Sequence, residues 1–72
     1  MFLICNKKTY KWTRTTGKIL INADHIIAVE ESEDSTAIIT CTGQNKEDEV
    51  LYYHLENTYD EVLGMLAKGR KL

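Results

Sequence analysis

The sequence predicts a small α+β domain, in which an antiparallel sheet of four or five strands carries one C-terminal helix on one face. Short segments that alternate apolar and polar residues recur between residues 2 and 55, which is typical of strands. A single stretch after residue 57 has the apolar spacing of a helix. The chain has 72 residues, no proline and no repeat, so we treat residues 1–72 as one domain.

Six segments fit the alternation expected of strands. They are separated by turns and polar loops, and they cover residues 2–5, 10–13, 18–22, 26–31, 36–42 and 49–55. The second segment continues or restarts the first and places Tyr10 and Trp12 on one face. The last segment is apolar on both faces.

Turn residues mark two bends between these strands. Gly17 closes a turn after Arg14, and we expect it to take a positive φ, which glycine does at little cost. Asn22 and Asp24 interrupt the alternation, and their short polar side chains are expected to bond nearby backbone groups and to redirect the next strand. We therefore assign Gly17, Asn22 and Asp24 a structural role.

The helix prediction rests on its ends and on its spacing. Thr58 and Glu61 have the spacing of a capping box, which places the helix start after Thr58. Gly69 is a typical stop signal. The spacing gives the helix one apolar stripe, made of Tyr59, Val62, Leu63 and Leu66.

One helix covers one face of a small sheet, so the second apolar face requires another cover. We expect Ile19, Ile21, Ile39 and Cys41 under the helix. The interface candidates on the opposite side are Trp12, Leu20, Ile38, Leu51 and Tyr53. A second copy of the chain is the simplest cover, since two-fold assemblies are the commonest, and another protein is a further option. A sheet curled into a partly closed barrel would instead bury both sets within one chain.

Composition argues against catalysis. Cys5 and Cys41 form no CxxC pair, and with His25 and His54 they give no zinc-type spacing, so we expect reduced, packed thiols. No catalytic constellation is present, and we expect no enzyme activity, metal, cofactor or small-molecule substrate. The sequence shows neither an export signal nor an apolar run of about 20 residues, so we expect a soluble cytoplasmic protein without membrane insertion.

Charge suggests an alternative function. Residues 1–18 contain five basic residues and no acid, whereas all 11 acids lie between residues 24 and 61. Basic groups interleaved with aromatic rings are typical of proteins that bind single-stranded nucleic acid. The residues that would bind are Lys7, Lys8, Tyr10, Lys11, Trp12 and Arg14. The net charge of −2 and the pI of about 5.6 argue against this alternative.

Several motifs together resemble a known family. They are TRTTGK at residues 13–18, INADHI at 21–26, VEE at 29–31, ITCTG at 39–43 and NTYDEVL at 57–63. In this pattern, which spans residues 13–63, the chain is similar to the small bacterial flagellar and swarming-motility proteins of the FlbD type. The resemblance implies a shared small fold and a non-enzymatic role associated with motility. Protein interaction is therefore the function that the sequence predicts first.

Overall fold

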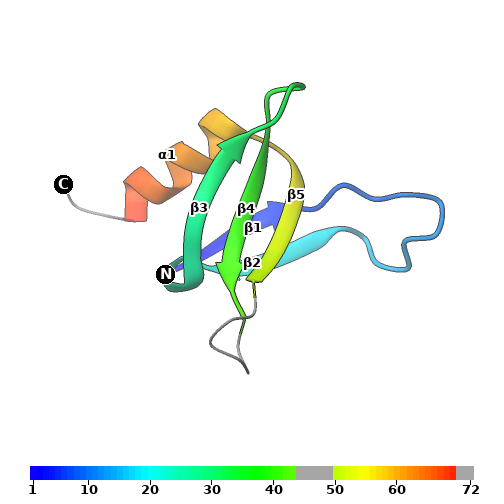
Figure 1. Ribbon diagram of the computed structural model, residues 1–72, viewed down its shortest axis with the longest axis horizontal. Helices are drawn as coiled ribbons and strands as arrows, with labels where there is room; N and C mark the ends of the chain where they lie inside the picture. The colour runs from blue at the N-terminus through cyan, green and yellow to red at the C-terminus, as the bar shows by residue number, and fades with distance from the viewer. Residues whose placement is uncertain (44–49, 70–72) are drawn as a thin grey trace.

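Within the described residues, the fold consists of five strands in two antiparallel sheets and one C-terminal helix (Figure 1). The computed structural model describes residues 1–43 and 50–69. In chain order the strands and the helix are β1 (Phe2–Asn6), β2 (Lys18–Asn22), β3 (Ile26–Glu31), β4 (Thr36–Thr42), β5 (Val50–Thr58) and α1 (Tyr59–Gly69). The α+β class is confirmed. The strands divide into a sheet of two, β1–β2, and a sheet of three, β3–β4–β5, and not into the single sheet predicted.

The hairpin of β1 and β2 has one buried face and one exposed face. Ile4 pairs with Leu20, and burial alternates along both strands as the pleat requires. Leu3, Cys5 and Ile21 point into the interior and are buried. The sequence predicts Ile21 under the helix. It is buried, but on the hairpin, and α1 packs mainly on β3, β4 and β5. Leu20 lies on the outward side as predicted.

A 3₁₀ turn, η1 (Ala23–His25), carries the chain from the first sheet to the second. The Asn22 side-chain oxygen accepts a hydrogen bond from the backbone N–H of Asp24 at 3.0 Å, which confirms the bond expected for Asn22. Asp24 contributes its backbone N–H to this turn, and its carboxylate is exposed. The bend places Ile26 against the core.

The register of the three-stranded sheet corrects one prediction. Tyr53 pairs with Ile39 and Leu51 pairs with Cys41. Residues directly opposite in an antiparallel ladder share a face, so Leu51 and Tyr53 lie on the inner face and pack against the core. Their predicted position on the outer face, away from the helix, is therefore wrong. Ile38 pairs with His54 and does lie on the outer face.

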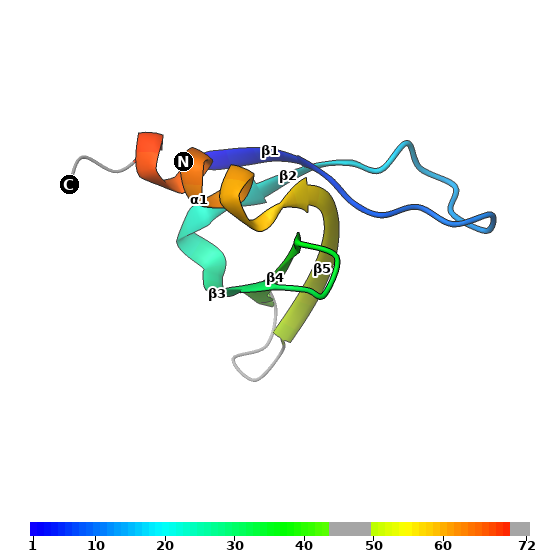
Figure 2. The ribbon, with the colours of Figure 1, turned by 90° about the horizontal axis from the view of Figure 1, so that it is seen from above.

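The two sheets meet along one edge and enclose the core. Lys7 forms a bridge with Leu55, and the Lys8 backbone N–H donates to the His54 carbonyl oxygen at 2.9 Å. Figure 2 shows the β1–β2 hairpin lying over the three-stranded sheet, with α1 beside it. The buried apolar cluster consists of Leu3, Cys5, Ile21, Ala37, Ile39, Cys41, Leu55 and Val62. The chain therefore covers its inner sheet face with its own hairpin as well as with the helix, which is the arrangement closest to the curled-sheet alternative.

Helix α1 begins as the capping box predicts. The Glu61 backbone N–H donates to the Thr58 hydroxyl oxygen, and the Thr58 backbone N–H donates to the Glu61 carboxylate, both at 3.1 Å. The predicted stripe is partly wrong. Val62 is fully buried and Leu66 packs against the core, but Met65 packs there too, whereas Leu63 is exposed.

Candidate functional site

The histidines do not converge on a common site. His25 Nδ1 lies 3.1 Å from the Thr42 hydroxyl oxygen, and His54 Nε2 lies 3.1 Å from the Thr36 hydroxyl oxygen. Thr36 and Thr42 are the two ends of β4, so the two rings are placed at opposite ends of that strand. Within residues 1–43 and 50–69, no group of three or more His, Cys, Asp or Glu residues is arranged to hold a metal ion.

The two cysteines are unpaired thiols in the core. Cys5 and Cys41 are both buried, and burial raises the pKa of each thiol because the thiolate would lose its hydration. A reactive cysteine requires the opposite, a partly exposed site that lowers the thiol pKa. These positions favour packing over nucleophilic chemistry.

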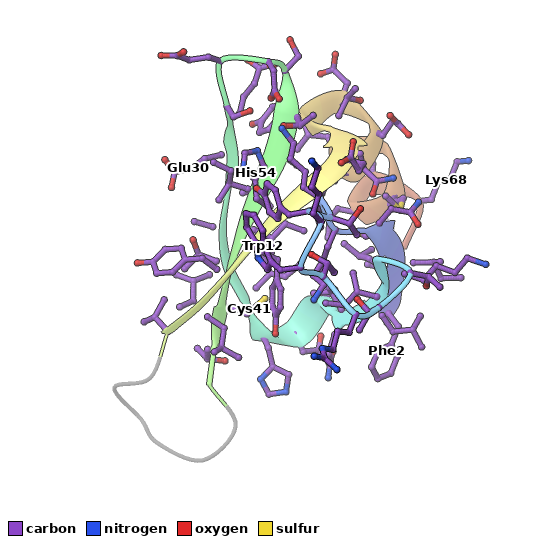
Figure 3. All side chains as sticks on the ribbon, turned by 90° about the vertical axis from the view of Figure 1, so that its right-hand side faces the viewer. Phe2, Trp12, Glu30, Cys41, His54 and Lys68 are labelled. Atoms are coloured by element: carbon purple, nitrogen blue, oxygen red, sulfur yellow. The ribbon has the colours of Figure 1, made fainter. Side chains whose placement is uncertain are left out.

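A group of exposed apolar side chains lies on the outer side of the β1–β2 hairpin. Phe2, Ile4 and Leu20 are 63, 74 and 64% exposed, and Ile4 and Leu20 are direct cross-strand neighbours. We call these three residues the hairpin face. Beside it, a groove of about 360 Å³ runs towards α1, where Met65 and Lys68 line it. Figure 3 places Phe2 and Glu30 on opposite sides of the molecule, so this face points away from the outer side of β3.

The structure brings three of the five predicted interface residues to one small cavity and places the other two elsewhere. Leu20 belongs to the hairpin face. Leu51 and Tyr53 line, together with Leu20, a small cavity of about 90 Å³ between β2 and the ends of β4 and β5. Ile38 is half-buried on the outer face of the three-stranded sheet. Trp12 lies in the middle of the segment that joins β1 to β2 and belongs to neither sheet.

Sequence reasoning did not select Phe2 and Ile4 as interface residues. A usable signal exists, because residues 2–5 are all apolar and a strand of this length must point alternate side chains to opposite faces. Pairing with residues 18–22 then places Ile4 beside Leu20. The pairing of β1 with β2 is a long-range contact, and no local motif predicts it.

The segment between β1 and β2 forms a second candidate surface. We call residues 7–17 the arm. Lys7 and Lys8 attach its start to β5, and the rest of the segment extends away from the two sheets and from α1 in both ribbon views (Figures 1 and 2). The Thr13 backbone N–H donates to the Tyr10 carbonyl oxygen, and the Tyr10 backbone N–H donates to the Thr13 hydroxyl oxygen, both at 2.9 Å. These bonds close a turn, so the strand predicted over residues 10–13 is wrong.

Two aromatic rings stack on the arm. The ring centroids of Tyr10 and Trp12 are 4.9 Å apart and their planes differ by 7°. The side chains remain 53 and 77% exposed, so the pair packs on itself and not on the core. The strand prediction had placed both rings on one side, and the turn keeps them together.

Gly17 ends the arm in the conformation that the sequence predicts. Its φ is +88°, which confirms the positive value expected. A Cβ at this position would lie 2.8 Å from the Lys7 carbonyl oxygen, and the Gly17 carbonyl oxygen accepts the Lys7 backbone N–H at 2.7 Å. Glycine therefore permits both the turn and the close approach of the two strands.

One cation of the arm is bound by the three-stranded sheet. The Lys8 ammonium pairs with Asp34 in the β3–β4 turn, where Ser32 and Thr36 also donate to the same carboxylate. The Lys8 hydrogen bond, followed by those from Ser32 and Thr36, holds the pKa of Asp34 well below its usual range. The pKa of Lys8 is raised, mainly by the same hydrogen bond.

A groove of about 300 Å³ separates the arm from β5. Its lining combines lysines with aromatic rings and consists of Lys7, Lys8, Tyr10, Thr13, Tyr52, Tyr53 and His54. Tyr52 is 69% exposed, so one wall of the groove presents a free ring opposite the arm. Of the nucleic-acid candidates, Lys7, Lys8 and Tyr10 line this groove, whereas the structure does not place Lys11, Trp12 or Arg14 in its lining.

No model of a protein family, no curated protein and no solved structure matches this chain. In the part of the chain that the structure describes, no helix has both the length and the apolarity required to cross a membrane.

Proposed function

We propose that this chain is a non-enzymatic interaction module that binds a second copy of itself through the hairpin face. The observation that carries the proposal is the exposure of Phe2, Ile4 and Leu20, which are contiguous and each about two thirds exposed. Monomeric proteins rarely leave such a group of large apolar side chains in water unless it takes part in binding. The resemblance to motility proteins supports assembly over catalysis, and the buried, unpaired thiols support a cytoplasmic location.

The charge on the hairpin supports a second copy as the partner. The outward row of β1 and β2 carries one charged side chain, Lys18, while Asn6 and Asn22 complete its polar ends. When the two-fold axis of an isologous interface crosses the strands, two hairpins packed face to face run in opposite directions. Lys18 then lies over the Asn22 end of the second copy, and the two lysines are kept apart.

The energetics predict a moderate affinity. Burial of the six exposed side chains of two hairpin faces gives roughly 6 to 12 kcal/mol, allowing for the part of each that is already covered. Association costs about 4 to 15 kcal/mol. The most favourable combination leaves about −8 kcal/mol, and the patch is smaller than a standard interface, so we expect a reversible dimer with a Kd no tighter than about micromolar.

The test is the mass in solution as a function of concentration. The native chain is expected to change from monomer to dimer across the micromolar range in sedimentation equilibrium, and Leu20→Lys is expected to stay monomeric. Ile27→Lys is the matched control, because Ile27 is also apolar and 57% exposed but lies on β3. A native chain that stays monomeric at every concentration would overturn the proposal, as would equal loss of the dimer in both variants.

A further inference from the structure

We propose that the arm and the facing surface of β5 form a binding site for single-stranded nucleic acid. This function goes beyond the self-association proposed above and uses different residues, apart from Lys18, which also lies on the outward row of the hairpin. Its ligand class follows from three features, which are the free stacking surfaces, the unpaired positive charges and the position of the acids.

The stacking surfaces come from both sides of the groove. Tyr10 and Trp12 are already parallel to within 7°, and the more exposed ring, Trp12 at 77%, leaves a flat face open to a further planar group. Tyr52 supplies a third exposed ring from β5 across the groove. Nucleobases stack on such rings without regard to sequence, and only unpaired bases present their faces, so the site favours a single strand.

Lys7 and Lys8 line the groove together with Tyr10 and Tyr52, and Lys11, Arg14 and Lys18 follow on the same segment of chain or at its end. Within the described residues no carboxylate forms an ion pair with Lys7, Lys11, Arg14 or Lys18, so these four cations are available to phosphates. Lys8 is different, because Asp34 binds it and Glu56 lies near enough to act on it. We therefore assign phosphate binding to the four and leave Lys8 a structural role.

The position of the acids answers the objection raised by the acidic pI. The first acid of the chain is Asp24, which follows β2, so neither strand of the hairpin nor the arm contains a carboxylate. The arm projects away from the rest of the molecule in two perpendicular views (Figures 1 and 2). Of the acids that the structure describes, Asp34 and Glu56 act on the groove, both at Lys8. Charges more than about 8 to 10 Å away are largely screened at physiological salt.

An acidic peptide is the competing ligand for a basic groove. It would use the lysines and the arginine equally well, but its carboxylates have no planar apolar face to place on Tyr10 and Trp12. The parallel, exposed pair is the feature that a base uses and a polyacidic chain does not, so the structure favours nucleic acid.

The chain contains one tryptophan, Trp12, so the intrinsic tryptophan fluorescence of the protein reports on the arm alone. A thymidine oligonucleotide of about 15 nucleotides is titrated at low salt, about 50 mM, and is expected to quench the Trp12 emission as a base stacks on the ring. Unchanged emission and no binding by anisotropy of a labelled oligonucleotide would overturn the proposal.

Variants then separate stacking from charge. Tyr10→Ala and Trp12→Ala, followed by oligonucleotide anisotropy, are each expected to weaken binding by about 5- to 100-fold. Phe2→Ala is the matched control, because it removes an exposed aromatic ring from the hairpin face and should leave affinity unchanged. Equal effects of all three substitutions would contradict a site on the arm. Far-ultraviolet circular dichroism checks that each variant folds.

Salt dependence and a competitor complete the test. Four phosphate contacts predict that log K falls with log salt with a slope of about −3, and the double variant Lys11→Gln/Arg14→Gln should make the slope less negative by about 1.4. Polyglutamate of matched charge is the competitor, and it should displace the oligonucleotide weakly. Equal affinity for polyglutamate, without Trp12 quenching by the oligonucleotide, would assign the groove to acidic peptides and overturn the proposal.

Discussion

The outer face of the β1–β2 hairpin and the outer face of the three-stranded sheet differ in how their apolar residues are surrounded. On the three-stranded sheet, Ile38 lies between Glu30 and His54 on the neighbouring strands and is half-buried by its surroundings. On the hairpin, Ile4 and Leu20 are cross-strand neighbours, and their side chains remain 74 and 64% exposed. An apolar residue on the outer face of a sheet therefore does not by itself indicate a binding surface. Its cross-strand neighbours decide whether the residue remains available.

The largest expected difference comes from placing the same charge at a core-facing position, Leu51, and at an exposed position, Leu20. Leu51→Lys puts an ammonium against the core and is expected to lower the free energy of unfolding by about 2 to 4 kcal/mol. Leu20→Lys puts it on the exposed hairpin face, and the expected change is within about 0.5 kcal/mol. Urea unfolding of the two variants at a fixed low concentration measures both. Similar losses would show that Leu51 and Leu20 do not differ in burial.

A glycine pair tests the turn that holds the hairpin together. Gly17→Ala is expected to cost about 1 to 3 kcal/mol, because alanine resists a φ of +88° and its Cβ would overlap the Lys7 carbonyl oxygen. Gly64→Ala is the control with the opposite sign. Apart from its chain neighbours and the backbone of its own helix, no atom of the described residues lies within 4 Å of a Cβ at this position, so the stability should rise by up to about 1 kcal/mol. Thermal unfolding measures the stability of both variants. A Gly17→Ala variant as stable as the native chain would contradict the role assigned to Gly17.

The smallest expected effect concerns the link between the two sheets. The lowered pKa of Asp34 means that the unfolded chain binds more protons than the folded chain below about pH 4, so stability is lost as pH falls from there towards the folded pKa. Asp34→Asn should lower the free energy of unfolding at neutral pH and reduce its loss as the pH falls below about 4. Asp24→Asn removes the same charge from an exposed turn and should leave this acid-dependent loss unchanged. If Asp34→Asn loses as much stability in acid as the native chain does, the contact of Asp34 with Lys8 contributes nothing to the free energy of unfolding.

Signals read within a few residues predicted the local structure well. The strands over 18–22, 26–31 and 36–42 coincide with β2, β3 and β4, because each has a clear alternation bounded by polar residues. The capping box and Gly17 are equally local. In contrast, the strand predicted over 49–55 became Val50–Thr58, and the part of that prediction at residue 49 lies outside the described residues.

What the sequence did not predict depends on contacts between distant segments. Val50 and Tyr52 alternate with Leu51 and Tyr53, so both faces of β5 are apolar and only the pairing with β4 decides which one is buried. The cover that the hairpin gives to the core likewise requires β1 to meet β2 and β5. In the arm, two hydrogen bonds between Tyr10 and Thr13 override the strand pattern.

The most direct measurement is the mass and the folded state of the double variant Ile4→Lys/Leu20→Lys across the micromolar range, by sedimentation equilibrium and circular dichroism. The account predicts a monomer with native secondary structure, because both side chains project outward from a hairpin whose other face is already packed. An unfolded chain would show that these residues belong to the core. A folded dimer as stable as that of the native chain would show that copies meet elsewhere.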